Sequence, residues 1–415
     1  MRLLIASLHE PWPLNGGGRL HLYHVLDQLG RRADVTLVLP VAAEHRECLP
    51  RGLRVEVTAT GVGPDGLAAA TLPRGPWLSR LAARHFGYDA GLAAWLHQHA
   101  RPARFDAVLL HGAVLGQYAH LCHVPVVWDP VDELVLHAVR KAQFGRWYRW
   151  PAALRHAVLY ALYERNVARR AAVTTLVSSV DAAYARRWVG DAAIAVITHG
   201  VDLDYFRPTD TSAEPGTVAF VGSLEFPPNV DGIRWFASQV WPELWQSGAA
   251  RRLLVVGRRP VADVRALTAQ PGVELAADVP DVRPYLTRAA VVVVPTRQGG
   301  GVKNKVLEAC AMRRPVVASP RALGGLSARV GVDVLAAETP RQWLAQLTRL
   351  LTDPDEAATI AEGGYRWVQR AHRWATTGGR LYALLSRAAA PAPRDRPTPL
   401  DEPLAMPRRG ARGTP

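Results

Sequence analysis

The stretch with the clearest capacity for chemistry lies in the second half of the chain, where a glycine run precedes a charged, helix-like segment. Its residues are Gly299, Gly300, Gly301, Lys303, Lys305 and Glu308. The N–H groups of a glycine turn and of a following helix N-terminus bind anions. Lys305 and Glu308 are three positions apart, so they share one helix face. A nucleoside diphosphate suits this set, since the lysine would meet the phosphates and the carboxylate would accept ribose hydroxyls. The alternative is a weak surface ion pair.

A second glycine loop follows the first apolar, strand-like run of the chain. Gly16, Gly17 and Gly18 stand directly before a helix-like segment. The dinucleotide-binding pattern G-x-G-x-x-G fails here, because His21 occupies the last glycine position. The loop follows the carboxyl end of a strand, which favours ligand contact over a plain flexible turn.

Other polar residues are open to two interpretations. His111 follows an apolar strand and is either a structural histidine or a catalytic one. Asp129 and Asp132 flank a turn after the next strand, where they either hydrogen-bond an acceptor or cap a helix. Asp202 and Asp204 fit a D-x-D metal pattern, but they stand in a turn-rich segment, and we interpret them as part of a loop.

The elements that position these residues follow from the hydrophobic pattern. The expected strands are 3–7, 35–39, 106–110, 124–128, 173–177, 194–197, 218–221, 253–256, 291–294 and 316–318. The expected helices are 17–29, 230–245, 261–268, 302–312, 340–351 and 356–371, with another between the third and fourth strands. Apolar, β-branched strands alternating with helices indicate parallel sheets covered on both faces. This predicts an α/β protein with two doubly wound, Rossmann-like domains facing a central cleft, where ligands of such sheets bind.

The domain boundaries are placed by turn-rich composition. We expect an N-terminal domain over 1–200, a linker over 201–216 and a C-terminal domain over 217–375. Residues 376–388 are predicted to form a helix that returns toward the N-terminal domain. The tail 389–415 is rich in Pro, Arg and Ala, and is predicted to be disordered.

Composition narrows the class further. The chain has 415 residues, 49% of them hydrophobic, which suits two domains. Its three cysteines are far apart, so neither a disulfide framework nor a zinc site is expected. No apolar run reaches the roughly 18 residues of a membrane helix. The first apolar stretch is too short for a signal peptide, and we expect a cytoplasmic protein.

Positive charge is concentrated in one segment. The formal net charge is +14, and residues 140–190 contain ten Lys and Arg against Glu164 and Asp181. Tryptophan and tyrosine are interleaved with these cations, a mixture that suits an anionic membrane surface, here the inner membrane face, or a phosphorylated acceptor. The alternative is a solvated helical face that confers solubility.

Several motifs together resemble those of the family-4 glycosyltransferases. Residues 299–309, followed by 314–319, look like the family's donor-site signature. Residues 220–224 with 228–231 are similar to the opening of its second domain, and 200–206 and 281–286 also match. In detail the chain is similar to sugar transferases found with bacterial exopolysaccharide and exosortase systems. The resemblance extends from residue 1 to about residue 388.

The resemblance implies a GT-B fold and metal-independent sugar transfer with retention of configuration. It implies an N-terminal domain on the acceptor side and a C-terminal domain that binds the donor. The catalytic candidates are His111, Lys305 and Glu308, with His111 near the reacting carbon, Lys305 near the diphosphate and Glu308 on the ribose. The remaining donor-binding candidates are Gly16, Gly17, Gly222, Ser223, Val279, Asp281, Gly299, Gly300, Gly301 and Lys303. No metal or cofactor is implied beyond the nucleotide sugar.

The chain departs from the family pattern at three places. Gly300 stands where many members have a glutamate, and His199 replaces the usual asparagine. The segment 225–229 has no cation where many members have one. Lys303 and Lys305 would then neutralise more of the leaving diphosphate.

The function expected is transfer of a sugar from a nucleoside-diphosphate donor to a hydroxyl of a glycan, a lipid-linked or a small-molecule acceptor. One alternative is a nucleotide-sugar epimerase of the same architecture. Another is a non-catalytic protein that binds nucleotides or polyanions through the basic segment; nucleic acid is not the expected partner.

Overall fold

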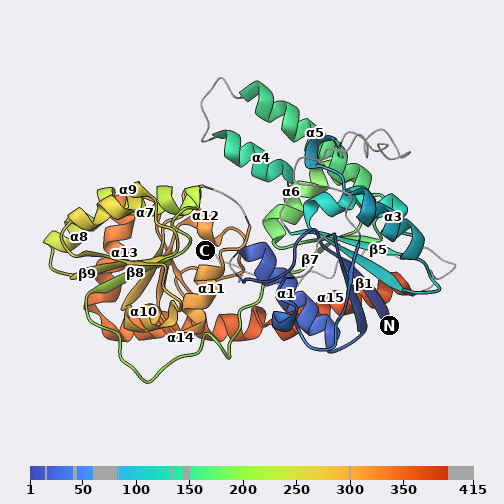
Figure 1. Ribbon diagram of the computed structural model, residues 1–415. Coiled ribbons are helices and arrows are strands. Elements are labelled where there is room, and N and C mark those ends of the chain that lie inside the picture. The colour runs from blue at the N-terminus through green and yellow to red at the C-terminus, as the bar shows by residue number, and fades with distance from the viewer. Residues whose placement is uncertain are drawn as a thin grey trace, which may run out of the picture.

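The computed structural model describes residues 1–14, 16–40, 44–58, 82, 84–131, 134–143, 150–298 and 301–390. Within them, strands and helices alternate, and the strands form two parallel sheets, one in each half of the chain. Figure 1 shows the two halves as separate lobes, with the N-terminal strands in one and the strands that begin at Thr217 in the other. The prediction of an α/β protein with two Rossmann-like domains is confirmed.

The N-terminal sheet has the strand order β3-β2-β1-β4-β5-β6-β7, and its pairings are parallel. The strands are β1 (Arg2–Ala6), β2 (Asp34–Leu39), β3 (Arg54–Val57), β4 (Ala107–His111), β5 (Val126–Val131), β6 (Val173–Leu176) and β7 (Ile194–Val196). The strand β1 is buried on both faces, with Leu4 in one hydrophobic cluster and Ile5 in the other. The order reverses between β1 and β4, so ligand-binding loops are expected at the carboxyl ends of these two strands.

The C-terminal sheet has the order β10-β9-β8-β11-β12-β13 and is also parallel. The strands are β8 (Thr217–Val221), β9 (Arg252–Gly257), β10 (Val273–Ala277), β11 (Val291–Val294), β12 (Val316–Ala318) and β13 (Leu335–Ala336). As in the first sheet, the central strand β8 sends Phe220 into one cluster and Val221 into the other. The strand order reverses between β8 and β11, so ligand-binding loops are also expected at the carboxyl ends of these two strands.

Helices cover both sheets. In the first half they are α1 (Gly17–Gly30), α3 (Ala90–His99), α4 (Leu134–Gln143), α5 (Trp150–Ala168) and α6 (Ser179–Val189), with 3₁₀ segments at Arg46–Cys48 and Ala113–Leu121. In the second half they are α7 (Pro227–Gln239), α8 (Trp241–Gln246), α9 (Ala262–Arg265), α10 (Arg283–Arg288), α11 (Asn304–Ala311), α12 (Pro320–Leu323), α13 (Pro340–Thr352), α14 (Pro354–Ala371) and α15 (Trp374–Ala389), with a 3₁₀ segment at Ala266–Ala269.

Four expected helices differ from the structure. The one expected over 261–268 is the short helix α9 followed by a 3₁₀ segment, and the one expected between strands 106–110 and 124–128 is a 3₁₀ segment, Ala113–Leu121. The helix predicted over 230–245 is two helices, α7 and α8, which separate at Val240. Pro242 follows closely, and a proline cannot continue the hydrogen-bond ladder of a preceding helix. The helix predicted from 302 begins at Asn304, so Lys303 is its N-cap and lies outside the first turn.

The last helix crosses back to the N-terminal domain. The helix α15 packs on α1, and Leu381 and Leu385 join the cluster that contains Leu3 and Ile5. Figure 1 shows α15 beside α1 in the N-terminal lobe. A Cβ at Gly378 would lie 2.2 Å from the Cβ of Gln28, so only glycine permits this close approach.

The two chain segments that cross between the domains are hydrogen-bonded to each other. The backbone N–H of Val201 donates to the carbonyl of His372 at 2.7 Å. The hydroxyl of Thr377 donates to the carbonyl of Thr198 at 3.1 Å. The two segments that connect the domains are therefore held together by hydrogen bonds and do not cross independently of each other.

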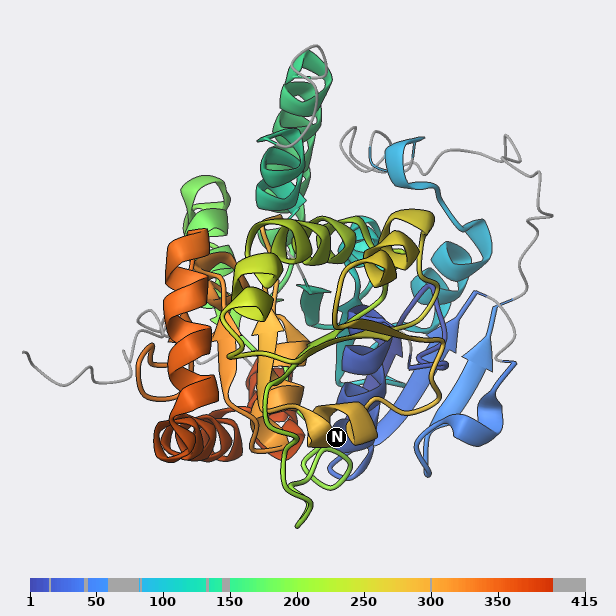
Figure 2. The same cartoon turned by 90° about the vertical axis from the view of Figure 1, so that its left-hand side faces the viewer.

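The helices α4 and α5 pack against each other and project from the N-terminal lobe. Figure 1 labels this pair, and Figure 2 shows it in green, standing out from the rest of the molecule. Leu154, Val158 and Leu162 on α5 are exposed, at 67%, 52% and 41%. Over the residues that the structure describes, no helix combines the length and apolar character that crossing a bilayer demands.

Candidate active site

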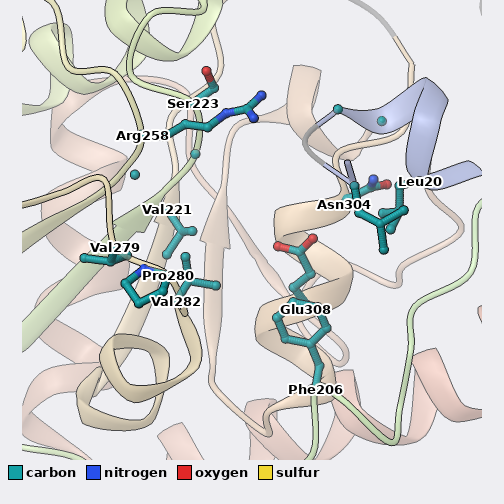
Figure 3. A pocket seen from close by; sticks show the side chains of 15 residues that line it. Leu20, Phe206, Val221, Ser223, Arg258, Val279, Pro280, Val282, Asn304 and Glu308 are labelled. Carbon is teal, nitrogen blue, oxygen red and sulfur yellow. The ribbon is translucent and has the colours of Figure 1, made fainter. Parts of the chain in front are cut away.

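A cavity of about 420 Å³, which we call the interdomain cavity, lies at the carboxyl ends of both sheets (Figure 3). The N-terminal domain contributes the loop before α1, and the C-terminal domain contributes the loops after β8, β9 and β10 together with α11. The lining residues are Leu14, Gly16, Gly17, Leu20, Phe206, Val221, Gly222, Ser223, Gly257, Arg258, Val279, Pro280, Val282, Asn304 and Glu308. Of the candidates from the sequence, the structure brings together Gly16, Gly17, Gly222, Ser223, Val279 and Glu308.

Of the two charged residues of α11, Glu308 lines this cavity and Lys305 lies beside Gly222 of its wall. Figure 3 shows the carboxylate of Glu308 directed into it. The ammonium of Lys305 donates a hydrogen bond to Asn229 Oδ1 at 2.8 Å and lies 4.5 Å from the centre of the Phe220 ring. A Cβ at Gly222 would be 2.5 Å from Lys305 Nζ, so this glycine makes room for the ammonium. Both charged residues are partly buried, unlike a freely solvated surface pair.

Burial changes the protonation of this pair. It lowers the pKa of the Lys305 ammonium to about 7, an effect that the charge of Glu308 opposes and that of Lys303 reinforces. Burial likewise raises the pKa of the Glu308 carboxyl to about 7, against the opposing effect of Lys305. A phosphate beside Lys305 would favour the charged ammonium and raise its pKa again. A perturbed pair in a cavity is typical of a binding or catalytic site.

The ends of β8 and β9 approach each other closely at the cavity wall. A Cβ at Gly257 would lie 1.8 Å from the carbonyl oxygen of Gly222, and Gly222 N–H donates to the carbonyl of Val256 at 3.0 Å. Without side chains at 222 and 257, the wall is made of backbone groups that a ligand can approach.

Two polar residues of the cavity were not predicted from the sequence. Within the described lining, Arg258 is the only cation, and Figure 3 shows its side chain extending into the cavity beside Ser223. Asn304 is the first residue of α11. Its Oδ1 atom lies 2.9 Å from His199 Nδ1. His199, noted above as a departure from the family, therefore links the domain junction to α11. No local sequence pattern distinguishes Arg258 from a surface arginine, whereas Asn304 lay within the donor-site signature.

A second cavity, of about 570 Å³, lies in the N-terminal domain, and we call it the His111 cavity. It is lined by Ser7, Leu8, His9, Glu10, Gly16, Gly18, Arg19, Leu22, His111, Gly112, Ala113, Val114, Leu115, Pro130, Val131 and Arg258. Gly16 and Arg258 line both cavities. The two spaces are therefore neighbours, separated by the glycine loop and one arginine.

Asp129 fixes His111 from behind the cavity wall. His111 Nδ1 lies 2.9 Å from Asp129 Oδ2, His21 Nε2 lies 3.2 Å from the same oxygen, and Thr175 donates to Oδ1 at 2.8 Å. Burial alone would raise the pKa of Asp129, but His21 and His111 outweigh it and hold this pKa well below its usual range. An ionised carboxylate only accepts, so Nδ1 of His111 carries the proton and Nε2 remains for a ligand.

This arrangement bears on the acceptor prediction for Asp129. Asp129 is only 2% exposed, and it lines neither cavity. The geometry assigns it a positioning role toward His111, and its direct contact with an acceptor stays a prediction. Asp132 lies outside the described residues.

Three donor-site candidates lie away from the lining. Lys303 Nζ donates to the carbonyl of Gly301 at 3.4 Å, and neither residue lines the interdomain cavity. Asp281 pairs with Arg283 at 2.7 Å and accepts from the Tyr205 hydroxyl at 3.4 Å. Gly299 and Gly300 lie outside the described residues, so their predicted contact with phosphates stays a prediction.

Two groups of side chains among the described residues have the composition of a metal site. One is His21, His111 and Asp129, and the other is Glu10, Glu44 and His45. In the first, the ligand atoms already hydrogen-bond one another. In the second, His45 Nδ1 lies 2.9 Å from Glu10 Oε1. Hydrogen bonds therefore account for both groups.

The sequence of the C-terminal half matches a family model. Residues 215–353 match the model described as glycosyl transferases group 1. The C-terminal domain is that of a group 1 glycosyl transferase. The match spans Gly222, Arg258, Lys305 and Glu308, so this wall of the interdomain cavity belongs to the glycosyl transferase domain.

Comparison with known proteins extends the likeness to both domains. A D-inositol 3-phosphate glycosyltransferase of Thermobispora bispora is 28% identical over 228 residues, 47% of this chain, and the match spans 50% of that protein's length. A sucrose-phosphate synthase structure from Thermosynechococcus elongatus has a TM-score of 0.68 at 18% identity, covering 94% of this chain and 100% of that one. The Anabaena protein HepE, solved with UDP and glucose, has a TM-score of 0.65 at 16% identity, covering 93% and 100%. These structures show that both domains of the chain, over the part that they cover, have the GT-B fold.

Proposed function

We propose that the protein transfers a sugar from a nucleoside-diphosphate donor to an acceptor hydroxyl, with retention of configuration. The observation that carries this proposal is the position of Glu308 in a cavity bounded by glycine loops from both domains, with the Lys305 ammonium beside Gly222 of the cavity wall. The carboxylate suits ribose hydroxyls, and the ammonium with the backbone N–H groups suits a diphosphate. HepE was solved with UDP and glucose, which supports a uridine diphosphate sugar as the first donor to test.

The reaction follows from where charge develops. The bond between the anomeric carbon and the diphosphate oxygen breaks, and its electron pair leaves with the diphosphate. Lys305 and the backbone amides stabilise that growing charge. The acceptor hydroxyl, oriented by His111, forms the new bond to the anomeric carbon from the same face. Its proton passes to the departing diphosphate.

The acceptor is assigned to the His111 cavity. That cavity adjoins the interdomain cavity at Gly16 and Arg258, so an acceptor there would face a donor across the glycine loop. Polar groups on its wall, including Glu10 and Arg19, suit a hydroxylated acceptor such as a glycan or the head of a lipid-linked sugar.

We also propose that α5 brings the protein to an anionic membrane surface. Leu154, Val158 and Leu162 recur every four residues, so they form one exposed stripe on the helix. Arg155 and Arg165 are exposed on the same helix. An apolar stripe with arginines suits the interface of an anionic bilayer. Sedimentation with phosphatidylglycerol vesicles tests this; binding equal to that of phosphatidylcholine vesicles would contradict it.

The transferase proposal is tested by supplying a panel of nucleoside-diphosphate sugars with and without hydroxyl acceptors. Nucleoside diphosphate should be released faster when an acceptor is present, and NMR of the product should show the donor's anomeric configuration. A sugar product that forms without any acceptor would indicate an epimerase instead. Binding without turnover for every donor would indicate a binding protein.

A further inference from the structure

The cavity assigned to the donor is short of positive charge where the diphosphate departs. The segment 225–229 after β8 carries no cation. Lys303 does not line the cavity and donates to the carbonyl of Gly301. Lys305 has its pKa lowered to about 7 by burial, so it is partly uncharged at neutral pH before a ligand arrives. Lys305 is also absent from the described lining of the cavity, so a second cation there would add positive charge where the diphosphate departs.

Arg258 is held where such a cation would act. Its carbonyl accepts from the N–H of Leu224 at 2.9 Å, which ties it to the turn after β8. The preceding Gly257 packs against Gly222 and accepts from the N–H of Asp278 at 2.8 Å. The backbone is thus fixed on both sides. Figure 3 shows the side chain crossing from this fixed point toward the space between the domains.

The position of Arg258 between the two cavities sets its role. It is the only cation in the described lining of the interdomain cavity, and it also lines the His111 cavity. The bond that breaks lies where donor and acceptor meet, which is the boundary shared by these cavities. We propose that Arg258 contacts the departing diphosphate at this boundary and replaces the cation that is missing after β8.

This inference rests on the proposed transferase function and adds a residue to it. A guanidinium stays charged at every physiological pH and binds phosphate oxygens through two parallel N–H groups. It can therefore supply charge that does not depend on the protonation of Lys305. Arg258 touches the leaving group, so it acts as a catalytic residue.

The experiment compares Arg258→Gln with Arg258→Lys and with the matched control Arg259→Gln. The neighbouring Arg259 lies 3.4 Å from Glu225 and is exposed, so its substitution removes the same charge one residue away. Binding of UDP, ADP, GDP, CDP and dTDP, and of the corresponding nucleosides, is measured by calorimetry, and turnover is measured with the active donor.

We expect Arg258→Gln to lower turnover by about a hundredfold. It should weaken nucleoside diphosphate binding by about tenfold and leave nucleoside binding unchanged. Arg258→Lys should recover part of the turnover, and Arg259→Gln should match the unsubstituted protein. Thermal unfolding of each variant checks that the fold is retained.

Three outcomes would contradict the proposals, each in a different way. If the unsubstituted protein binds no nucleoside diphosphate, the proposed function fails. If it binds and turns over but Arg258→Gln behaves like Arg259→Gln, the transferase stands and the role of Arg258 is overturned. Equal loss of nucleoside and diphosphate binding in Arg258→Gln would also overturn it, because the contact would not be to phosphate.

Discussion

Lys305 is the residue on which charge stabilisation in the interdomain cavity most depends. Its ammonium contacts Asn229 and the Phe220 ring rather than any carboxylate at hydrogen-bond distance that the structure describes. Lys305→Ala should lower turnover by about a hundredfold or more, since it removes one well-placed charge stabiliser. The fold should persist, which circular dichroism and thermal unfolding would show. Turnover close to that of the unsubstituted protein would contradict the assignment.

The lowered pKa of Lys305 and the raised pKa of Glu308 predict that activity has a narrow pH optimum. Glu308 accepts hydrogen bonds from ribose hydroxyls more strongly when it is ionised, so activity should rise with pH up to its pKa of about 7. Lys305 is charged only below its pKa of about 7, so activity should fall as pH rises further. The quantity to measure is kcat/KM for the donor, which reports the free enzyme.

Two variants separate the limbs of that pH profile. Glu308→Gln should abolish the rising limb, and Lys305→Arg should abolish the falling limb because a guanidinium stays charged. A profile that both substitutions leave unchanged would show that other groups control it.

Asp129 acts through His111, and its substitution should show this indirect role. Asp129→Asn removes the ionised acceptor of His111 Nδ1 and of His21 Nε2. We expect turnover to fall by about tenfold to a hundredfold, with little change in donor binding. The control is Thr175→Val, which removes only the bond to Oδ1. Equal losses of donor affinity and turnover in Asp129→Asn would indicate structural damage instead.

At the scale of residues, the parts of the site that could be predicted are those that form a recognisable motif over a few consecutive residues. The glycine loops and the Lys305–Glu308 spacing are such patterns, and the structure places Gly16, Gly17 and Glu308 in one cavity. Arg258 could not be predicted, because its role comes from the pairing of β8 with β9 and not from its neighbours in the chain. The same holds for the contacts of Asp129 with two histidines, which come from different elements.

At the scale of elements, central strands were easier to predict than edge strands. β8 and β11 are continuous apolar runs because both their faces are buried. Three edge strands, β3, β10 and β13, were missed. β3 and β10 are partly exposed and contain Glu or Ala, which are depleted in strands. The missed strand β10 matters for function, because the loop after it brings Val279 to the cavity.

The close contact between α1 and α15 leads to a prediction about stability. Gly378→Ala would place a Cβ 2.2 Å from the Cβ of Gln28, and we expect a loss of about 1–3 kcal/mol in unfolding free energy. The control is Gly379→Ala in the same helix, where a Cβ meets nothing within 4 Å. That change should stabilise the protein by about 0.5–1 kcal/mol. Denaturant unfolding measures both; destabilisation by Gly379→Ala equal to that by Gly378→Ala would contradict the packing argument.

At the scale of the whole molecule, the interdomain cavity couples ligand binding to the stability of both lobes. Gly17 lines it from one domain and Glu308 from the other. A nucleoside diphosphate at a hundred times its dissociation constant should stabilise the fold by about 2.7 kcal/mol. Thermal unfolding should then shift upward in one transition. Stabilisation of only one of two resolved transitions would place the ligand in a single domain.

The return of α15 to the first lobe has a consequence for synthesis on the ribosome. Leu381 and Leu385 complete the packing of Leu3 and Ile5, yet about 180 residues separate them from the last strand of that sheet. At the usual pace of translation, this interval is on the order of tens of seconds. One face of the earliest-made sheet stays incompletely covered throughout this interval. The half of the protein that is translated first therefore cannot complete its packing until the last helix has been made.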